Sequence, residues 1–187
     1  MRKIVIHLTL FLLSTHVLYG EMDVIHTDVR MAAFYPQGSL FRSIYGNWQV
    51  DYELEIGKIF LKNYEAWANI NFLTTSGQTI LGNSTTFKNC NISVGGKYIF
   101  RFKEIWKLYL GLGINDALVY AHNYSSYVKK HVHKNGVGGV FKLGVYVEPM
   151  DHLFIDVFAD YLYQPIHFDH WQQIGGLKIG SGVGFCY

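Results

Sequence analysis

The feature that most constrains the fold of this chain is a two-residue alternation of apolar and polar side chains. Between Trp48 and Ile56 every second residue is apolar, and the alternate positions are Gln49 or acidic. Successive side chains of a β-strand point to opposite faces, so a period of two indicates a strand. The same alternation recurs along the chain and predicts eight strands, near residues 24–35, 48–56, 66–72, 89–100, 106–115, 141–147, 155–163 and 177–187.

Composition narrows what a chain of eight strands can be. Of 187 residues, 16% are charged and 17% aromatic, and the formal net charge is +2. This small charge argues against nucleic acid or another polyanion as partner. The only two cysteines, Cys90 and Cys186, imply no disulfide framework, and the alternation puts them on opposite faces. The sequence therefore predicts either a secreted β protein or a membrane β-barrel.

The first twenty residues have the pattern of an export signal. Arg2 and Lys3 precede an apolar run that ends at Leu13, and Gly20 precedes the polar Glu21. The run is too short for a membrane-spanning helix but fits a secretory signal peptide. We therefore expect residues 1–20 to be a signal peptide and residues 21–187 to form one β-barrel domain.

The connections between the predicted strands are short and long in turn. Outer-membrane barrels have short turns on the periplasmic rim and long loops outside. An even number of strands then places both termini on the rim with short turns. The predicted short connections are 62–65, 101–105 and 148–152, and the long ones are 36–47, 74–87, 120–137 and 164–175.

Alternation alone does not decide which face points outward. A soluble eight-stranded barrel of the lipocalin type would enclose its apolar face. Here the polar face of the last four strands is rich in glycine, as a narrow eight-stranded interior requires. The apolar face carries aromatic residues near both strand ends, as membrane interfaces do. These aromatic residues are Tyr35, Trp48, Phe72 and Tyr163 toward one rim, and Phe100, Trp106, Phe185 and Tyr187 toward the other.

The sequence ends in alternating apolar residues with a terminal aromatic, at Val183, Phe185 and Tyr187. This ending resembles the C-terminal signal of Gram-negative outer-membrane β-barrels, which the barrel-assembly machinery reads. By pattern, residues 21–187 resemble the small eight-stranded families typified by outer-membrane proteins A, X and W; a cysteine at position 186 departs from that pattern. The resemblance implies an all-β, antiparallel, up-and-down transmembrane barrel in the cell outer membrane, in contact with its lipid and lipopolysaccharide.

Charged residues of the polar face would lie inside such a barrel. Six acids and five bases nearly balance there, and buried charges need partners because desolvating an unpaired charge costs several kcal/mol. We therefore predict a filled, charge-balanced interior that does not conduct. The predicted network comprises Asp28, Arg30, Asp51, Glu53, Glu55, Lys97, Lys107, Lys142, Asp156, Asp160 and Lys178.

A filled interior leaves function to the loops, so we expect a structural or adhesive surface platform that contacts a host or surface molecule. The alternative is a porin-like channel or transporter for small solutes. A lipid A-modifying enzyme is the least favoured class, because its candidates, His122 with Ser125 or Ser126, lie in a predicted loop of unknown shape. We expect no enzymatic activity, no catalytic residues and no cofactor.

A basic segment in the third long connection has two interpretations. Lys129, Lys130 and Lys134 could bind the phosphates of lipopolysaccharide. Alternatively, its His-x-His motif could hold zinc or copper together with ligands from the last connection. The residues of the metal hypothesis are His131, His133, His167, Asp169 and His170. Histidines that are simply solvated in the loop are the favoured explanation of the motif, and the phosphate contact ranks above the metal site. We predict no metal site, because the motif lacks cysteine and a defined geometry and three neighbouring lysines would repel a cation.

Overall fold

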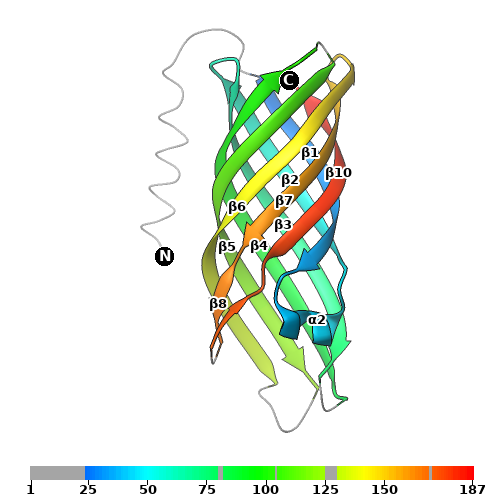
Figure 1. Cartoon of the computed structure of the whole chain (residues 1–187), viewed down its shortest axis with the longest axis vertical. Coiled ribbons are helices and arrows are strands. Elements are labelled where there is room, and N and C mark those ends of the chain that lie inside the picture. Colours follow the sequence, from blue (N-terminus) through cyan, green and yellow to red (C-terminus); the bar gives the residue numbers. More distant parts are fainter. Residues whose placement is uncertain (1–23, 80–81, 104, 125–129, 169) are drawn as a thin grey trace.

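The chain forms a closed antiparallel β-barrel in a computed structural model that describes residues 24–79, 82–103, 105–124, 130–168 and 170–187 (Figure 1). The barrel strands follow the spatial order β1-β10-β7-β6-β5-β4-β3-β2, and β1 also pairs with β2. The barrel closes where the last strand meets the first. The predicted signal peptide lies outside the described residues.

Eight long strands form the barrel wall: β1 (Val24–Pro36), β2 (Gln49–Phe60), β3 (Tyr64–Gln78), β4 (Ser84–Arg101), β5 (Trp106–Asn123), β6 (His131–Met150), β7 (Leu153–Tyr163) and β10 (Gly176–Cys186). A seven-residue helix, α2 (Ser39–Tyr45), connects β1 to β2. A small hairpin of β8 (Pro165–His167) and β9 (Trp171–Gln173) connects β7 to β10. No helix among these described residues has the length and apolar character of a membrane span.

The two rims of the barrel differ. The tight connections β2–β3, β4–β5 and β6–β7 and the end of β10 lie at the upper rim in Figure 1, which we call the turn rim. Helix α2 and the β8–β9 hairpin lie at the opposite rim, which we call the loop rim. This arrangement confirms that short and long connections alternate around the barrel.

The apolar face points outward, as predicted. Trp106, Leu110, Leu112, Ile114 and Leu118 of β5 are exposed large apolar residues on its outer face, where Asp116 is the one exposed acid. Twelve residues separate Trp106 from Leu118, which spans about 30 Å along the barrel axis at ~3.3 Å per residue and a tilt of ~40°. That height slightly exceeds the apolar belt of a transmembrane barrel, about 25 Å tall, so Trp106 and Leu118 lie near its two edges.

Two of the predicted long loops, 74–87 and 120–137, were wrong in extent. Strand β3 continues to Gln78 and β4 starts at Ser84, while β5 continues to Asn123 and β6 starts at His131. Apolar alternation ends where a strand leaves the lipid layer, but backbone pairing continues through threonine, asparagine and histidine. The predicted turn 62–65 was also too long, because β3 already begins at Tyr64.

Candidate functional site

One row of residues paired across neighbouring strands runs through the charged interior. Its members lie opposite one another across β4, β5, β6, β7 and β10, and all face inward. The order is Lys97, Gly111, Lys142, Asp160 and Lys178. The row thus places cations of β4, β6 and β10 on the inner wall of a narrow barrel, and the glycine leaves room for the two lysines beside it.

Arg30 is the centre of this interior. Its side chain on β1 is fully buried. Nη1 lies 2.5 Å from Glu53 Oε1, Nε 3.0 Å from Asp156 Oδ2, and Nη2 3.2 Å from Asp160 Oδ2. The guanidinium also stacks over the Phe158 ring, 3.5 Å from its centroid. One arginine thus joins carboxylates of β2 and β7 across the barrel.

Two buried lysines surround the same carboxylates. Lys142 Nζ lies 2.5 Å from Glu55 Oε2 and 2.8 Å from Glu53 Oε1. Lys97 Nζ donates to Glu55 and, at 2.6 Å, to the hydroxyl of Tyr146. Because Coulomb attraction is strong in a low-dielectric interior, these contacts tie β2, β4 and β6 together.

Asparagines of β3 complete the network on the side of the loop rim. Asn69 Nδ2 donates to Glu53 Oε1 at 2.6 Å, and Asn71 Nδ2 donates to Asp51 Oδ1 at 2.9 Å. Lys178 of β10 pairs with Asp51 at 2.6 Å. With Tyr109 of β5 donating to Asp156, all eight wall strands contribute a side chain to this network.

The predicted balance of six acids and five bases was wrong. Lys107 lies at the turn rim and bonds there to Glu148, outside the central network. Glu65, which the sequence analysis placed in a turn, is buried on β3 and lies 3.4 Å from Lys97 Nζ. Seven carboxyl groups and four cations are buried among the described residues: Asp28, Asp51, Glu53, Glu55, Glu65, Asp156 and Asp160 against Arg30, Lys97, Lys142 and Lys178. The interior thus holds an excess of acidic groups.

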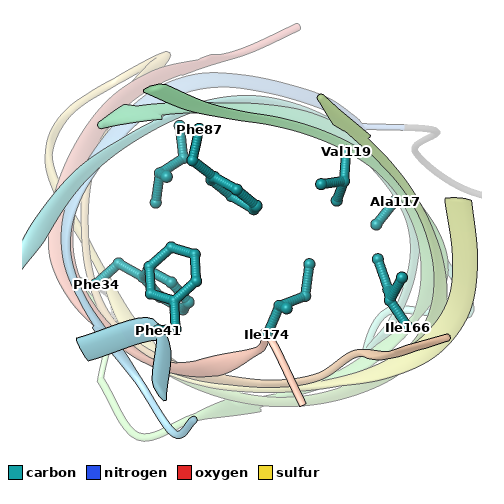
Figure 2. Close-up of a cluster of buried hydrophobic side chains, with 8 residues drawn as sticks. Phe34, Phe41, Phe87, Ala117, Val119, Ile166 and Ile174 are labelled. Atoms are coloured by element: carbon teal, nitrogen blue, oxygen red, sulfur yellow. The ribbon is translucent and has the colours of Figure 1, made fainter. Parts of the chain in front are cut away.

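Between this network and the loop rim lies an apolar cluster, which we call the outer plug. Figure 2 shows its side chains pointing inward from the wall strands, from α2 and from the segment between β7 and β10. Phe41 of α2 packs edge-on against Phe87 of β4, with ring centroids 4.8 Å apart. The outer plug consists of Phe34, Phe41, Leu73, Phe87, Ala117, Val119, Ile166 and Ile174.

The segment after β7 is anchored by Gln164, whose side chain is fully buried. Its Nε2 donates to the carbonyl of Gly136 at 2.6 Å, and its Oε1 accepts from Asn115. Its backbone N–H donates to Gln173 Oε1 at 2.7 Å. These bonds hold the β8–β9 hairpin against the barrel and bring Ile166 into the outer plug. This closure was not predicted, although isolated apolar residues inside polar connections were a signal for it.

The candidate lysines and histidines of the third long connection that the structure describes lie at the end of β5 and around the start of β6. Lys130 is exposed just before β6, and Lys134 is half-buried on β6. The rings of His122 and His131 lie 4.5 Å apart across β5 and β6, and the Tyr120 hydroxyl lies 2.8 Å from His131 Nδ1. Lys129, Ser125, Ser126 and Asp169 lie outside the described residues.

The last apolar residues lie on the outer face of β10. Val183, Phe185 and Tyr187 are all exposed there, within the belt. Their role as an assembly signal stays a prediction. Cys90 and Cys186 are both free thiols, the first outside the barrel and the second inside it.

A closed eight-stranded barrel with an apolar belt outside and charged side chains within defines the class of small transmembrane β-barrels. No protein-family model and no curated protein sequence matches the chain.

Solved structures of this class do match. Neisserial surface protein A superposes with a TM-score of 0.71 at 13% identity, over 89% of this chain and 100% of that one. The outer-membrane protein OprG of Pseudomonas aeruginosa superposes with a TM-score of 0.65 at 12% identity, over 90% of this chain and 97% of that one. A third match is Ail, the attachment invasion locus protein of Yersinia pestis, in complex with the heparin analogue sucrose octasulfate. It superposes with a TM-score of 0.57 at 15% identity, over 88% of this chain and 100% of that one. The predicted outer-membrane fold class is confirmed, and the predicted outer-membrane location agrees with these neighbours and with the apolar belt.

Proposed function

We propose that this barrel is a closed, non-conducting platform in the outer membrane that presents its loop rim to surface or host molecules. The observation that carries the proposal is the ion-pair network around Arg30, to which every wall strand contributes. A solute crossing the barrel has to separate these buried pairs. Breaking one buried pair costs about 3–5 kcal/mol, so an open state is rare. The outer plug adds a second barrier between the network and the loop rim.

Single-channel recording of the refolded mature protein in a planar bilayer tests the closed state. We expect no steady current from the wild type. Arg30→Ala and Glu53→Ala each remove one side of the central pairs, so brief openings should appear. Arg101→Ala removes the same charge as Arg30→Ala at the turn rim, where Arg101 Nη2 bonds to the carbonyl of Lys62, and should stay silent. Steady wild-type current would contradict a closed interior.

The proposed surface contact rests on the cations near the loop rim. Lys130 directly precedes β6 and Lys134 is its fourth residue, where the strands extend beyond the belt. A similar barrel, Ail, was solved with a sulfated heparin analogue. The shared chemistry is a polyanion, either a sulfated sugar or the phosphates of lipopolysaccharide.

Measuring the binding of sucrose octasulfate and of purified lipopolysaccharide to the folded protein distinguishes a sulfated sugar from lipopolysaccharide as the bound polyanion. A triple variant, Lys129→Ala with Lys130→Ala and Lys134→Ala, should weaken binding at least tenfold. Lys103→Ala removes an exposed lysine of the turn rim and should bind like the wild type. Equal binding by the triple variant would exclude the loop-rim lysines as the contact. An enzymatic role is not part of this proposal.

Transport of a small apolar solute is a second candidate function, in which the apolar lining of the outer plug would be a solute site instead of a barrier. Its walls are apolar, and at its edge the Tyr45 hydroxyl bonds to Thr85. Burial raises the pKa of Tyr45 and this hydrogen bond opposes the rise, so the phenol stays neutral at physiological pH. If the plug is a solute site, Phe87→Arg should abolish uptake of an apolar fluorescent probe into proteoliposomes. Wild-type proteoliposomes that take up no more probe than protein-free vesicles would exclude transport.

A further inference from the structure

A pocket of about 870 Å³ opens at the turn rim, on the opposite side of the network from the outer plug. Its lining includes His26 of β1, Glu148 of β6 and Cys186 of β10. The platform proposed above makes no use of these residues. They combine an imidazole, a carboxylate and a thiol, which are the side chains that bind borderline transition metals such as zinc.

The strand register brings His26 and Cys186 together. The two residues lie directly opposite each other where β1 meets β10, and both face inward. The neighbouring pair, Ile25 and Tyr187, exchanges both of its backbone hydrogen bonds. Pair types alternate along an antiparallel ladder, so His26 and Cys186 form a non-hydrogen-bonded pair, in which side chains approach most closely.

Glu148 reaches the pocket through an irregularity in the β6–β7 pairing. The register shifts between Val147 and Met150, as a β-bulge does when it redirects a side chain. Lys107 bonds to one carboxylate oxygen of Glu148, which leaves the other oxygen able to bind a cation. One potential ligand atom from each of His26, Glu148 and Cys186 lies within 4.8 Å of the other two.

His26 is the second, independent sign of a ligand. Its side chain is 3% exposed, yet neither ring nitrogen has a hydrogen-bond partner among the described residues. Buried polar groups normally have partners, because leaving one unsatisfied costs about 1–3 kcal/mol. Nδ1 lies 3.7 Å from Glu65 Oε2, an acid placed behind the ring as metal-binding histidines commonly have.

We propose that His26, Glu148 and Cys186 form a site for a divalent transition metal of the zinc class, with a fourth position open to the periplasm. Tetrahedral zinc with ordinary bond lengths places its ligand atoms about 3.3–3.7 Å apart. The three donors, which lie within 4.8 Å of one another, therefore need to close by up to about 1.5 Å. The carboxylate of Glu65 beside His26 favours a cation here, although Lys62 and Lys107 also line the pocket, the latter bonded to Glu148. Arg101, which lines the same pocket, is engaged by the Lys62 carbonyl.

The position of the site suggests what the metal does. His26 is on the first wall strand and Cys186 on the last, so the ion would link the two strands that close the barrel. Glu148 ties this seam to β6 on the far side of β7. The metal would thus stabilise barrel closure, because an ion that binds only the folded state raises its stability.

Cobalt titration of the full mature protein, refolded without a histidine tag, tests the site. Co²⁺ substitutes for zinc and shows a thiolate-to-metal absorption band only when a cysteine binds it. We expect one equivalent to produce this band in the wild type and in the Cys90→Ser control. The band should be absent in Cys186→Ser, and the Kd should rise at least tenfold in His26→Ala. Circular dichroism confirms that each variant is folded.

The outcomes are distinct. Cobalt binding without the thiolate band would place the ion elsewhere, for instance at the histidines of β5 and β6, and would overturn the proposal. No binding by the wild type, or a band that survives in Cys186→Ser, would overturn it as well. A thermal readout is independent of the spectrum: zinc should raise the unfolding temperature of the wild type and of Cys90→Ser but not that of Cys186→Ser. None of these results depends on conductance or polyanion binding.

Discussion

At the scale of single residues, small side chains decide whether the interior can be filled. Gly144 lies on the inward face of β6, directly opposite Tyr109 of β5. The Tyr109 ring occupies the space that any side chain at position 144 would need, and from there its hydroxyl reaches Asp156 at 3.0 Å. The glycine is therefore a steric requirement of the network.

The Gly144→Ala variant tests this requirement. The added methyl carbon would lie 2.5 Å from Tyr109 Cζ, so the phenol has to move out of the network. We expect a loss of about 1–3 kcal/mol in the free energy of unfolding, the usual cost of overpacking. Urea unfolding in lipid vesicles measures it.

Gly139→Ala on the same strand is the matched control. A methyl group there would meet only the carbonyl of Gly113, at 3.7 Å. Its stability should lie within about 0.5 kcal/mol of the wild type. Equal losses in the two variants would show that the backbone of β6, and not the Tyr109 contact, requires glycine.

At the scale of elements, helix α2 is held by tertiary contacts. It has seven residues, and no side chain caps its N-terminus at Gly38. So short a helix is unstable alone. Phe41 is buried in the outer plug, and Arg42 Nη1 donates to the carbonyls of Pro36 and Gln37, both at 2.7 Å. Losing the phenylalanine should therefore release the helix without unfolding the barrel.

Trypsin cleavage after Arg42 measures that release. Phe41→Ala removes a buried ring, which costs about 3–5 kcal/mol in a core. Each decrease of 1.4 kcal/mol in the free energy of local opening raises the cleavage rate tenfold, so we expect this rate to increase at least tenfold. Leu40→Ala, on the exposed side of the same helix, should be cut at the wild-type rate. If both variants are cut at equal rates, packing of Phe41 does not hold α2.

At the scale of the whole molecule, the apolar belt fixes how the barrel sits in the membrane. Leu112 is midway between Trp106 and Leu118 on β5, so it should lie near the middle of the bilayer. All three side chains point away from the barrel. Charges on the lipid face are penalised according to depth, which makes the position of the belt measurable.

Leu112→Arg and Leu118→Arg place the same charge at two depths. We expect Leu112→Arg to lower the free energy of unfolding by about 2–4 kcal/mol, and Leu118→Arg by about 1 kcal/mol or less. Unfolding of both variants in vesicles of one lipid composition gives the comparison. A larger loss at Leu118 would move the centre of the membrane toward the loop rim.

The sequence by itself determined the strands, the outward face and ten of the eleven charged side chains placed in the central network, because a period of two fixes the face of each residue. It did not determine that Glu65 is buried, because the predicted start of that strand was two residues too late. It also did not determine that Lys107 lies at the turn rim. The closure of the loop rim by Phe41 and Ile166, and the meeting of His26, Glu148 and Cys186, were decided only by the tertiary structure. The face that a residue occupies follows from its position along its own strand. These contacts depend instead on the register between strands far apart in the chain and on a shift in that register.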